Sequence, residues 1–158
     1  LDSVDGCSIP AAKLAGMQQL TCIRLSGVYE GRDSMRLEPG ALAAKPLLQH
    51  LSICALTMPS RPAGVTDLLA QLQQMAQLTW LELGHPLKPA AQSAAAYAAL
   101  TASSALQHLE LFQCDLPVGA WQHMAPPGKQ LPQLRHLRLC AIQVELFRPA
   151  DVSRLASR

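Results

Sequence analysis

The chain has 158 residues, of which 49% are apolar and 15% charged, and its formal net charge is +2. A charge this close to balance does not predict nucleic acid or an acidic substrate as the partner, and 4% aromatic residues are too few for a base-stacking platform. Length predicts one domain, residues 1–158. We expect no membrane insertion, because no run of about 18 apolar residues occurs and no signal peptide opens the chain.

A spaced apolar pattern recurs five times along the chain. It has an apolar residue at the first, fourth and sixth places: Leu20, Ile23, Leu25; Leu48, Leu51, Ile53; Leu78, Leu81, Leu83; Leu106, Leu109, Leu111; Leu134, Leu137, Leu139. The first positions lie 28, 30, 28 and 28 residues apart. Six residues before them stand Leu14, Leu42, Leu72 and Leu100, and only Gly128 breaks this second series. A fixed period in the twenties predicts a solenoid, in which each unit buries its apolar face against its neighbours.

In chain order, each unit is expected to contain one short strand and one outer segment. The first two strands are predicted near residues 22–25 and 50–53, with the later ones at the corresponding leucines. Helices are predicted at residues 11–17, 41–44, 65–75, 89–102, 120–124 and 149–157. The clearest is 65–75, with Thr66 or Asp67 as its N-cap, and 89–102 is rich in alanine. All twelve prolines lie outside the five apolar cores, which supports the strand positions because proline cannot donate in a central strand.

The units resemble leucine-rich repeats, and the period, with Cys114 and Leu116 after the fourth core, is similar to the ribonuclease-inhibitor-like and cysteine-containing subclasses. The resemblance implies an α/β horseshoe with a five-stranded parallel sheet on the concave face and helices and loops on the convex face. It also implies that Cys114 is a small core side chain. One departure concerns the Asn or Cys expected after each strand: only Cys114 keeps it, and the other repeats have Val28, Leu56, Pro86 and Ile142 there. The turns must therefore satisfy their backbone amides in another way.

From cysteine usage we expect a reducing, intracellular setting, the cytoplasm. The five cysteines are odd in number and include no C-x-x-C pair. The chain has no asparagine and hence no N-glycosylation acceptor. Both ends fall inside repeats, so we expect a segment of a longer array, or a partner that covers the two sheet edges.

Three columns of side chains are predicted on the concave face, because neighbouring residues of a strand point to opposite faces. The columns are Cys22, His50, Trp80, His108, His136; Arg24, Ser52, Glu82, Glu110, Arg138; and Ser26, Cys54, Gly84, Phe112, Cys140. From them we select the partner-binding candidates Trp80, Phe112, His50, His108, His136, Glu82, Glu110, Arg138 and Arg24. Exposed aromatics tend to be binding residues, so Trp80 is expected to contribute to binding rather than to folding.

A metal site is not predicted. His108 and His136 lie on adjacent strands and could approach one ion, but His50 lies beyond Trp80 and zinc needs three or four ligands. A pH-responsive face and ordinary solvated histidines remain the alternatives. No cofactor and no catalytic residues are expected, since no paired carboxylates or triad converge and nothing near Cys54 or Cys140 supplies an activating base.

These expectations favour a protein-protein interaction module, a scaffold or substrate-recognition arm, over an enzyme. The resemblance makes a substrate receptor for ubiquitin ligation, or an organelle or cytoskeletal assembly subunit, a specific possibility. Two alternatives stay open: a structural subunit embedded in a large assembly, and a regulatory array that inhibits or activates an enzyme by occlusion.

Overall fold

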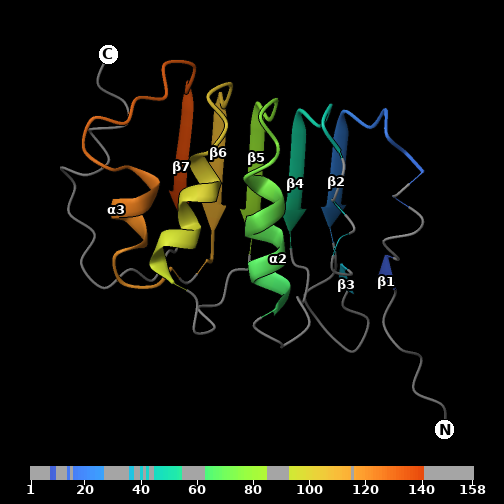
Figure 1. The fold of residues 1–158 in the computed structure, drawn as a ribbon, viewed down its shortest axis with the longest axis horizontal. Helices are drawn as coiled ribbons and strands as arrows, with labels where there is room; N and C mark the ends of the chain where they lie inside the picture. The colour runs from blue at the N-terminus through green and yellow to red at the C-terminus, as the bar shows by residue number, and fades with distance from the viewer. Residues whose placement is uncertain are drawn as a thin grey trace, which may run out of the picture.

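Five strands form one parallel sheet in the order in which they occur along the chain (Figure 1). The computed structural model describes residues 8–9, 14, 16–26, 36–37, 40, 42, 45–54, 63–84, 93–114 and 116–140. The strands are β2 (Cys22–Ser26), β4 (His50–Cys54), β5 (Trp80–Gly84), β6 (His108–Phe112) and β7 (His136–Cys140). Two further strands, β1 (Ser8–Ile9) and β3 (Arg36–Leu37), form a separate parallel pair. The predicted α/β class and five-stranded parallel sheet are confirmed.

The register of the sheet does not slip from one edge to the other. Leu51 pairs with Leu81, Leu81 with Leu109, and Leu109 with Leu137. Because side chains alternate between the faces of a strand, residues at equal positions in the five strands share one face. The spaced leucines therefore all point the same way.

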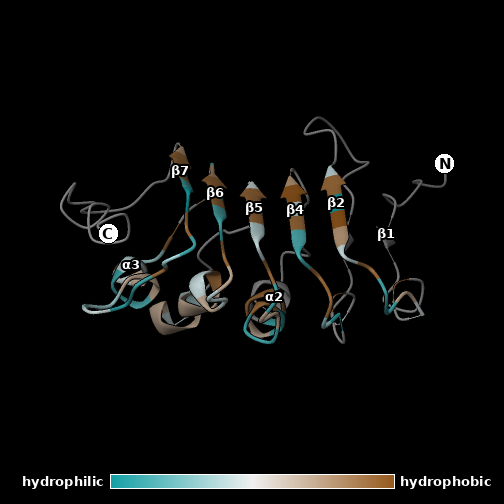
Figure 2. Cartoon of the chain, turned by 90° about the horizontal axis from the view of Figure 1, so that it is seen from above, coloured by the Kyte–Doolittle hydropathy of each residue, from teal (hydrophilic) through white to brown (hydrophobic). Residues whose placement is uncertain are grey.

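The apolar core lies between the sheet and a layer of helices on one side of it. Figure 2 shows the strands in a row along one side of the molecule, with α2 (Ala63–Leu72) and α3 (Ala120–Met124) along the other. Leu51, Leu81 and Leu109 have no exposed surface. Leucines of the second series lie in the layer opposite the sheet and are buried against it. They are Leu42, Leu72 and Leu100, each 1% exposed. Both series of the sequence thus meet in one interior, as predicted.

Helix α2 corresponds to the clearest predicted helix but has different ends. It begins at Ala63 and ends at Leu72, so the predicted caps, Thr66 and Asp67, were wrong because both lie within the helix. The Asp67 carboxylate instead accepts a hydrogen bond from the Gly40 backbone N–H, at 2.8 Å, and another from the Gln71 side-chain amide. Asp67 therefore connects α2 to the preceding unit.

The alanine-rich segment is a 3₁₀-helix, η1 (Ala94–Thr101), rather than an α-helix over 89–102. The Ser93 hydroxyl accepts a bond from the Ala95 N–H at 3.3 Å and so begins the helix. Side chains three apart eclipse one another in this geometry, which alanine tolerates because its side chain is small. Residues 85–92 lie outside the described part of the chain.

The remaining predicted helices have mixed outcomes. Helix α3 occupies residues 120–124, as predicted. Those at 11–17 and 41–44 fall mostly outside the described residues, and that at 149–157 falls wholly outside them. Within the described ranges, no helix combines the length and the apolar character that crossing a bilayer requires.

The same backbone hydrogen bonds recur along the five-stranded sheet. The backbone N–H of each leucine at the first place of the pattern donates to the carbonyl oxygen three residues earlier, with N···O distances of 2.9–3.3 Å. These leucines are Leu20, Leu48, Leu78, Leu106 and Leu134. One carbonyl before each of the first four strands accepts two successive N–H groups from the next unit; these acceptors are Thr21, Gln49, Thr79 and Gln107. The repeat seen in the sequence is therefore also a repeat of local conformation.

The turn after β6 satisfies its backbone and thiol donors with carbonyl groups. Gln113 adopts a positive φ of 51°, and its N–H donates to the Cys140 carbonyl at 2.8 Å. The buried Cys114 thiol lies 3.4 Å from the carbonyls of Leu83 and Phe112 as a weak donor to them. Cys114 is a small core side chain, as predicted.

Candidate functional site

The sheet face opposite the helices, here called the open face, consists of the first, third and fifth residue of each strand in the five-stranded sheet. Strand pairing brings the three predicted columns together in register, row by row. All nine predicted partner-binding residues lie on this face. Their placement was predictable because it depends only on the phase of the leucines.

Four planar side chains in the first column form a continuous stack across the sheet, here called the ring stack. The centroids of His50 and Trp80 lie 5.0 Å apart, those of Trp80 and His108 3.4 Å, and those of His108 and His136 4.1 Å. The planes of these pairs differ by 15°, 4° and 5°. Adjacent strands lie about 4.8 Å apart, close to the separation at which aromatic rings stack. In-register rings therefore cover one another's faces.

The ring stack corrects two expectations about exposure. His108 is only 9% exposed, so it is not an ordinary solvated histidine, whereas His136 at the end of the stack is exposed. Trp80 is half-buried between two imidazoles, and its indole N–H has no hydrogen-bond partner among the described residues. The stack leads us to expect that Trp80 also contributes to folding, which differs from the expectation drawn from the sequence. The signal for the stack was present in the sequence: four planar side chains stand at the same place in successive repeats.

Charged groups of the middle column extend across the sheet beside the ring stack. Arg24 donates to the His50 imidazole at 3.4 Å. An Arg138 guanidinium nitrogen lies 3.0 Å from Glu110 Oε1. The Cys54 thiol donates to Glu82 Oε1 at 3.4 Å. Each carboxylate thus has a hydrogen-bond donor from a neighbouring strand.

The surroundings of His50, His108 and Cys54 on the open face shift their pKa values in the direction that favours the neutral forms. Burial, and then the positive charge of Arg24, lower the pKa of His50. Burial, and then the neighbouring His136, lower the pKa of His108, although Glu110 opposes this. Burial also raises the pKa of the Cys54 thiol. The raised pKa favours the protonated thiol over the thiolate at Cys54.

The Phe112 ring lies over the neighbouring strand at Gly84. An added Cβ at Gly84 would be only 2.1 Å from Phe112 Cζ, so the ring occupies the space that any other residue would fill. Gly84 is buried as a result, and Phe112 is partly covered. Sequence analysis placed the two residues in one column but did not identify their contact.

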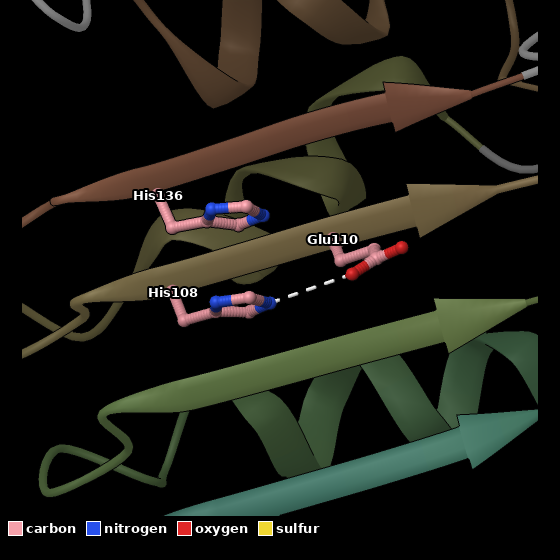
Figure 3. Close-up of side chains that lie close together, drawn as sticks. All are labelled: His108, Glu110 and His136. Atoms are coloured by element: carbon pink, nitrogen blue, oxygen red, sulfur yellow. Dashed lines mark ion pairs between the residues drawn. The ribbon is translucent and has the colours of Figure 1, made fainter.

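A second cluster on this face contains His108, Glu110 and His136, whose side chains project from β6 and β7 and lie close together (Figure 3). One ligand atom from each lies within 4.8 Å of the other two. Glu110 is a candidate third ligand, which the sequence analysis did not consider. It was missed because the histidines were compared only within their own column, while Glu110 lies two residues along the same strand and on the same face.

The chain matches no protein-family model, no curated protein and no solved structure. What its own residues establish is an α/β fold with a five-stranded parallel sheet. The resemblance to leucine-rich repeats stays a prediction.

Proposed function

We propose that the chain is a segment of a leucine-rich repeat solenoid, of the ribonuclease-inhibitor-like or cysteine-containing kind, that binds a protein partner through its open face. The recurrence of leucines and of the same backbone hydrogen bonds at intervals of 28–30 residues supports the repeat family. The observation that most favours binding is the unbroken register, which assembles residues from five separate segments into one surface.

The composition of the open face suits a protein ligand. Partly exposed aromatics, Trp80 and Phe112, lie on the central strand β5 and its neighbour β6, and exposed arginines, Arg24 and Arg138, lie on the two edge strands. An aromatic centre with a charged rim is typical of protein interfaces. Such a surface favours recognition over chemistry, in keeping with the protonated Cys54 thiol.

Glu82 indicates which charge the partner presents. It pairs in register with Glu110 on the next strand, but Glu110 has Arg138, whereas Glu82 has no ion pair with any described residue. Two neighbouring carboxylates disfavour each other unless cations compensate them. A lysine or arginine of the partner placed against Glu82 would supply that compensation.

Free thiols agree with the proposed intracellular setting. The four cysteines within the described ranges, Cys22, Cys54, Cys114 and Cys140, form no disulfide. A reducing compartment keeps such thiols unpaired.

Charge substitutions on the two faces test the proposal. Proteins recovered on the immobilised chain are compared for wild type, Arg24→Glu, Glu82→Gln and Gln73→Glu. Gln73 is an exposed residue just after α2, on the helix side, and is the matched control. We expect a stoichiometric partner with wild type and Gln73→Glu, and at least about tenfold weaker binding with Arg24→Glu and Glu82→Gln, as for losing a charged contact worth about 1.4 kcal/mol.

Three results count against binding at the open face. These are recovery of no stoichiometric partner by the wild-type chain, equal affinity of all four proteins, and loss of the partner with Gln73→Glu alone. Circular dichroism of each variant, unchanged from wild type, shows that the comparison concerns the surface rather than folding.

A further inference from the structure

We propose that His108, Glu110 and His136 form a binding site for a divalent transition-metal ion, with Zn²⁺ as the best fit, on the open face between β6 and β7. The site is independent of the proposed protein partner, because all three ligands belong to this chain. Figure 3 shows the two imidazoles side by side with the carboxylate at their open ends.

The donor set selects the class of metal. Two imidazole nitrogens and one carboxylate oxygen suit zinc and its first-row neighbours. Magnesium and calcium prefer ligand sets made only of oxygen. Three protein ligands leave a fourth position of a tetrahedral ion for water or for another ligand.

The spacing of the ligand atoms is close to what zinc requires. Zinc bonds of about 2.0–2.1 Å in a tetrahedron place neighbouring ligand atoms about 3.3 Å apart. His108 Nε2 and Glu110 Oε2 are 3.5 Å apart. The whole group lies within 4.8 Å, so closing the set around an ion requires the most widely spaced ligand atoms to approach each other by up to about 1.5 Å.

The His108 nitrogen supplies a second, independent observation. Nε2 is buried and has no hydrogen-bond partner among the described residues, since Glu110 at 3.5 Å is too distant for one. Leaving a buried polar atom unsatisfied costs about 1–3 kcal/mol. A metal bond to this nitrogen would remove that cost.

His136 is the ligand that must adjust. The two imidazole planes differ by only 5°, so their nitrogen lone pairs run parallel rather than toward one ion. His108 is fixed by Trp80 on its other face, at a centroid distance of 3.4 Å, whereas His136 is exposed. The second side-chain torsion of histidine has broad preferences, so His136 can tilt toward His108 at little cost.

Arg138 orients the carboxylate without occupying both of its oxygens. It binds Oε1 at 3.0 Å, while Oε2 faces His108. A ligating carboxylate is commonly held in this way by a further hydrogen bond, which fixes its orientation. Arg138 is 59% exposed, so water screens the repulsion between its charge and the ion.

Zinc titration of the full chain, at one fixed pH and in competition with a chromophoric chelator, tests the site. We expect one Zn²⁺ per chain, at least about tenfold weaker binding for Glu110→Gln and for His136→Gln, and no change for His123→Gln. His123 is an exposed histidine on α3, outside the cluster, and serves as the matched control. Losing one of the three ligands removes a metal bond. This should weaken binding by more than the 10–100-fold that follows the loss of a residue hydrogen-bonded to a ligand.

Cobalt substitution identifies the donor atoms independently of affinity. Bound Co²⁺ should show the intense visible bands of a tetrahedral ion without a sulfur-to-cobalt charge-transfer band, because all three ligands are nitrogen or oxygen. A charge-transfer band, an absence of stoichiometric zinc binding, or equal weakening by His123→Gln would overturn the proposal.

Discussion

Replacing Trp80 with alanine removes one of the two inner members of the ring stack. Trp80 lies between His50 and His108, with centroid distances of 5.0 and 3.4 Å. A stacked aromatic pair contributes about 0.5–1.5 kcal/mol beyond the area it buries, so losing both contacts costs about 1–3 kcal/mol. Loss of the half-buried indole surface adds to this, while a fully buried Trp→Ala change costs about 3–5 kcal/mol. We therefore expect Trp80→Ala to lower the free energy of unfolding by about 2–4 kcal/mol.

Equilibrium urea denaturation followed by circular dichroism measures this loss. The control is Trp80→Phe, which keeps a planar ring between the two imidazoles and should lose less than half as much. A binding residue exposed on the sheet would be replaced at almost no cost to folding. A loss below about 0.5 kcal/mol, the usual range for surface substitutions, would refute the stack, as would equal losses for alanine and phenylalanine.

Three other substitutions test separate parts of the structure. Leu109→Ala should cost about 2–5 kcal/mol through a cavity, because Leu109 has no exposed surface; Leu47→Ala, at a leucine 43% exposed, should cost less than about 0.5 kcal/mol in the same denaturation experiment. Gly84→Ala should displace the Phe112 ring and cost about 1–3 kcal/mol, whereas Gly16→Ala, with nothing within 4 Å of the new Cβ, should not destabilise; a Gly84→Ala protein as stable as wild type would contradict the contact. His50 lies beside Arg24 and Trp80 and is also within the electrostatic influence of Glu82. Folding lowers its pKa, so as pH decreases the unfolded chain binds a proton at His50 before the folded chain does. The free energy of unfolding should therefore fall as pH decreases below 6.5. When the pH is lowered from one unit above that value to one unit below it, the free energy of unfolding should fall less in His50→Gln than in wild type. An equal fall in the two proteins would show that His50 is not responsible.

The core and the open face were predictable because they depend on periodicity alone. Two leucine series at a constant offset determine which side chains point inward, and Leu51, Leu81 and Leu109 are buried accordingly. The strands also extend one residue beyond their predicted ends, to Ser26 and Cys54. Element ends depend on individual hydrogen bonds, which the apolar pattern does not specify.

The features that the sequence did not reveal depend on contacts between different columns or layers. The contact of Phe112 with Gly84 needs a side-chain rotamer as well as a register. The cluster at His108 combines residues of the first column with Glu110 of the middle column, and the sequence analysis compared these columns separately. Asp67 was expected to cap its own helix, yet it binds Gly40 of the preceding unit, because tertiary partners outweigh local capping preferences.

The distance between Arg24 and Arg138 tests most directly whether five in-register strands form one surface. These residues occupy the same position of β2 and β7, four strand spacings apart. At about 4.8 Å per spacing, their Cα atoms should be about 19 Å apart. Spin labels attached through unnatural amino acids, which leave the native cysteines in place, allow this distance to be measured by pulsed electron resonance. A single narrow distribution near that value, after allowance for the label arms, is the predicted result, whereas a broad distribution or one centred at twice that distance would contradict the stacked sheet and the open face with it.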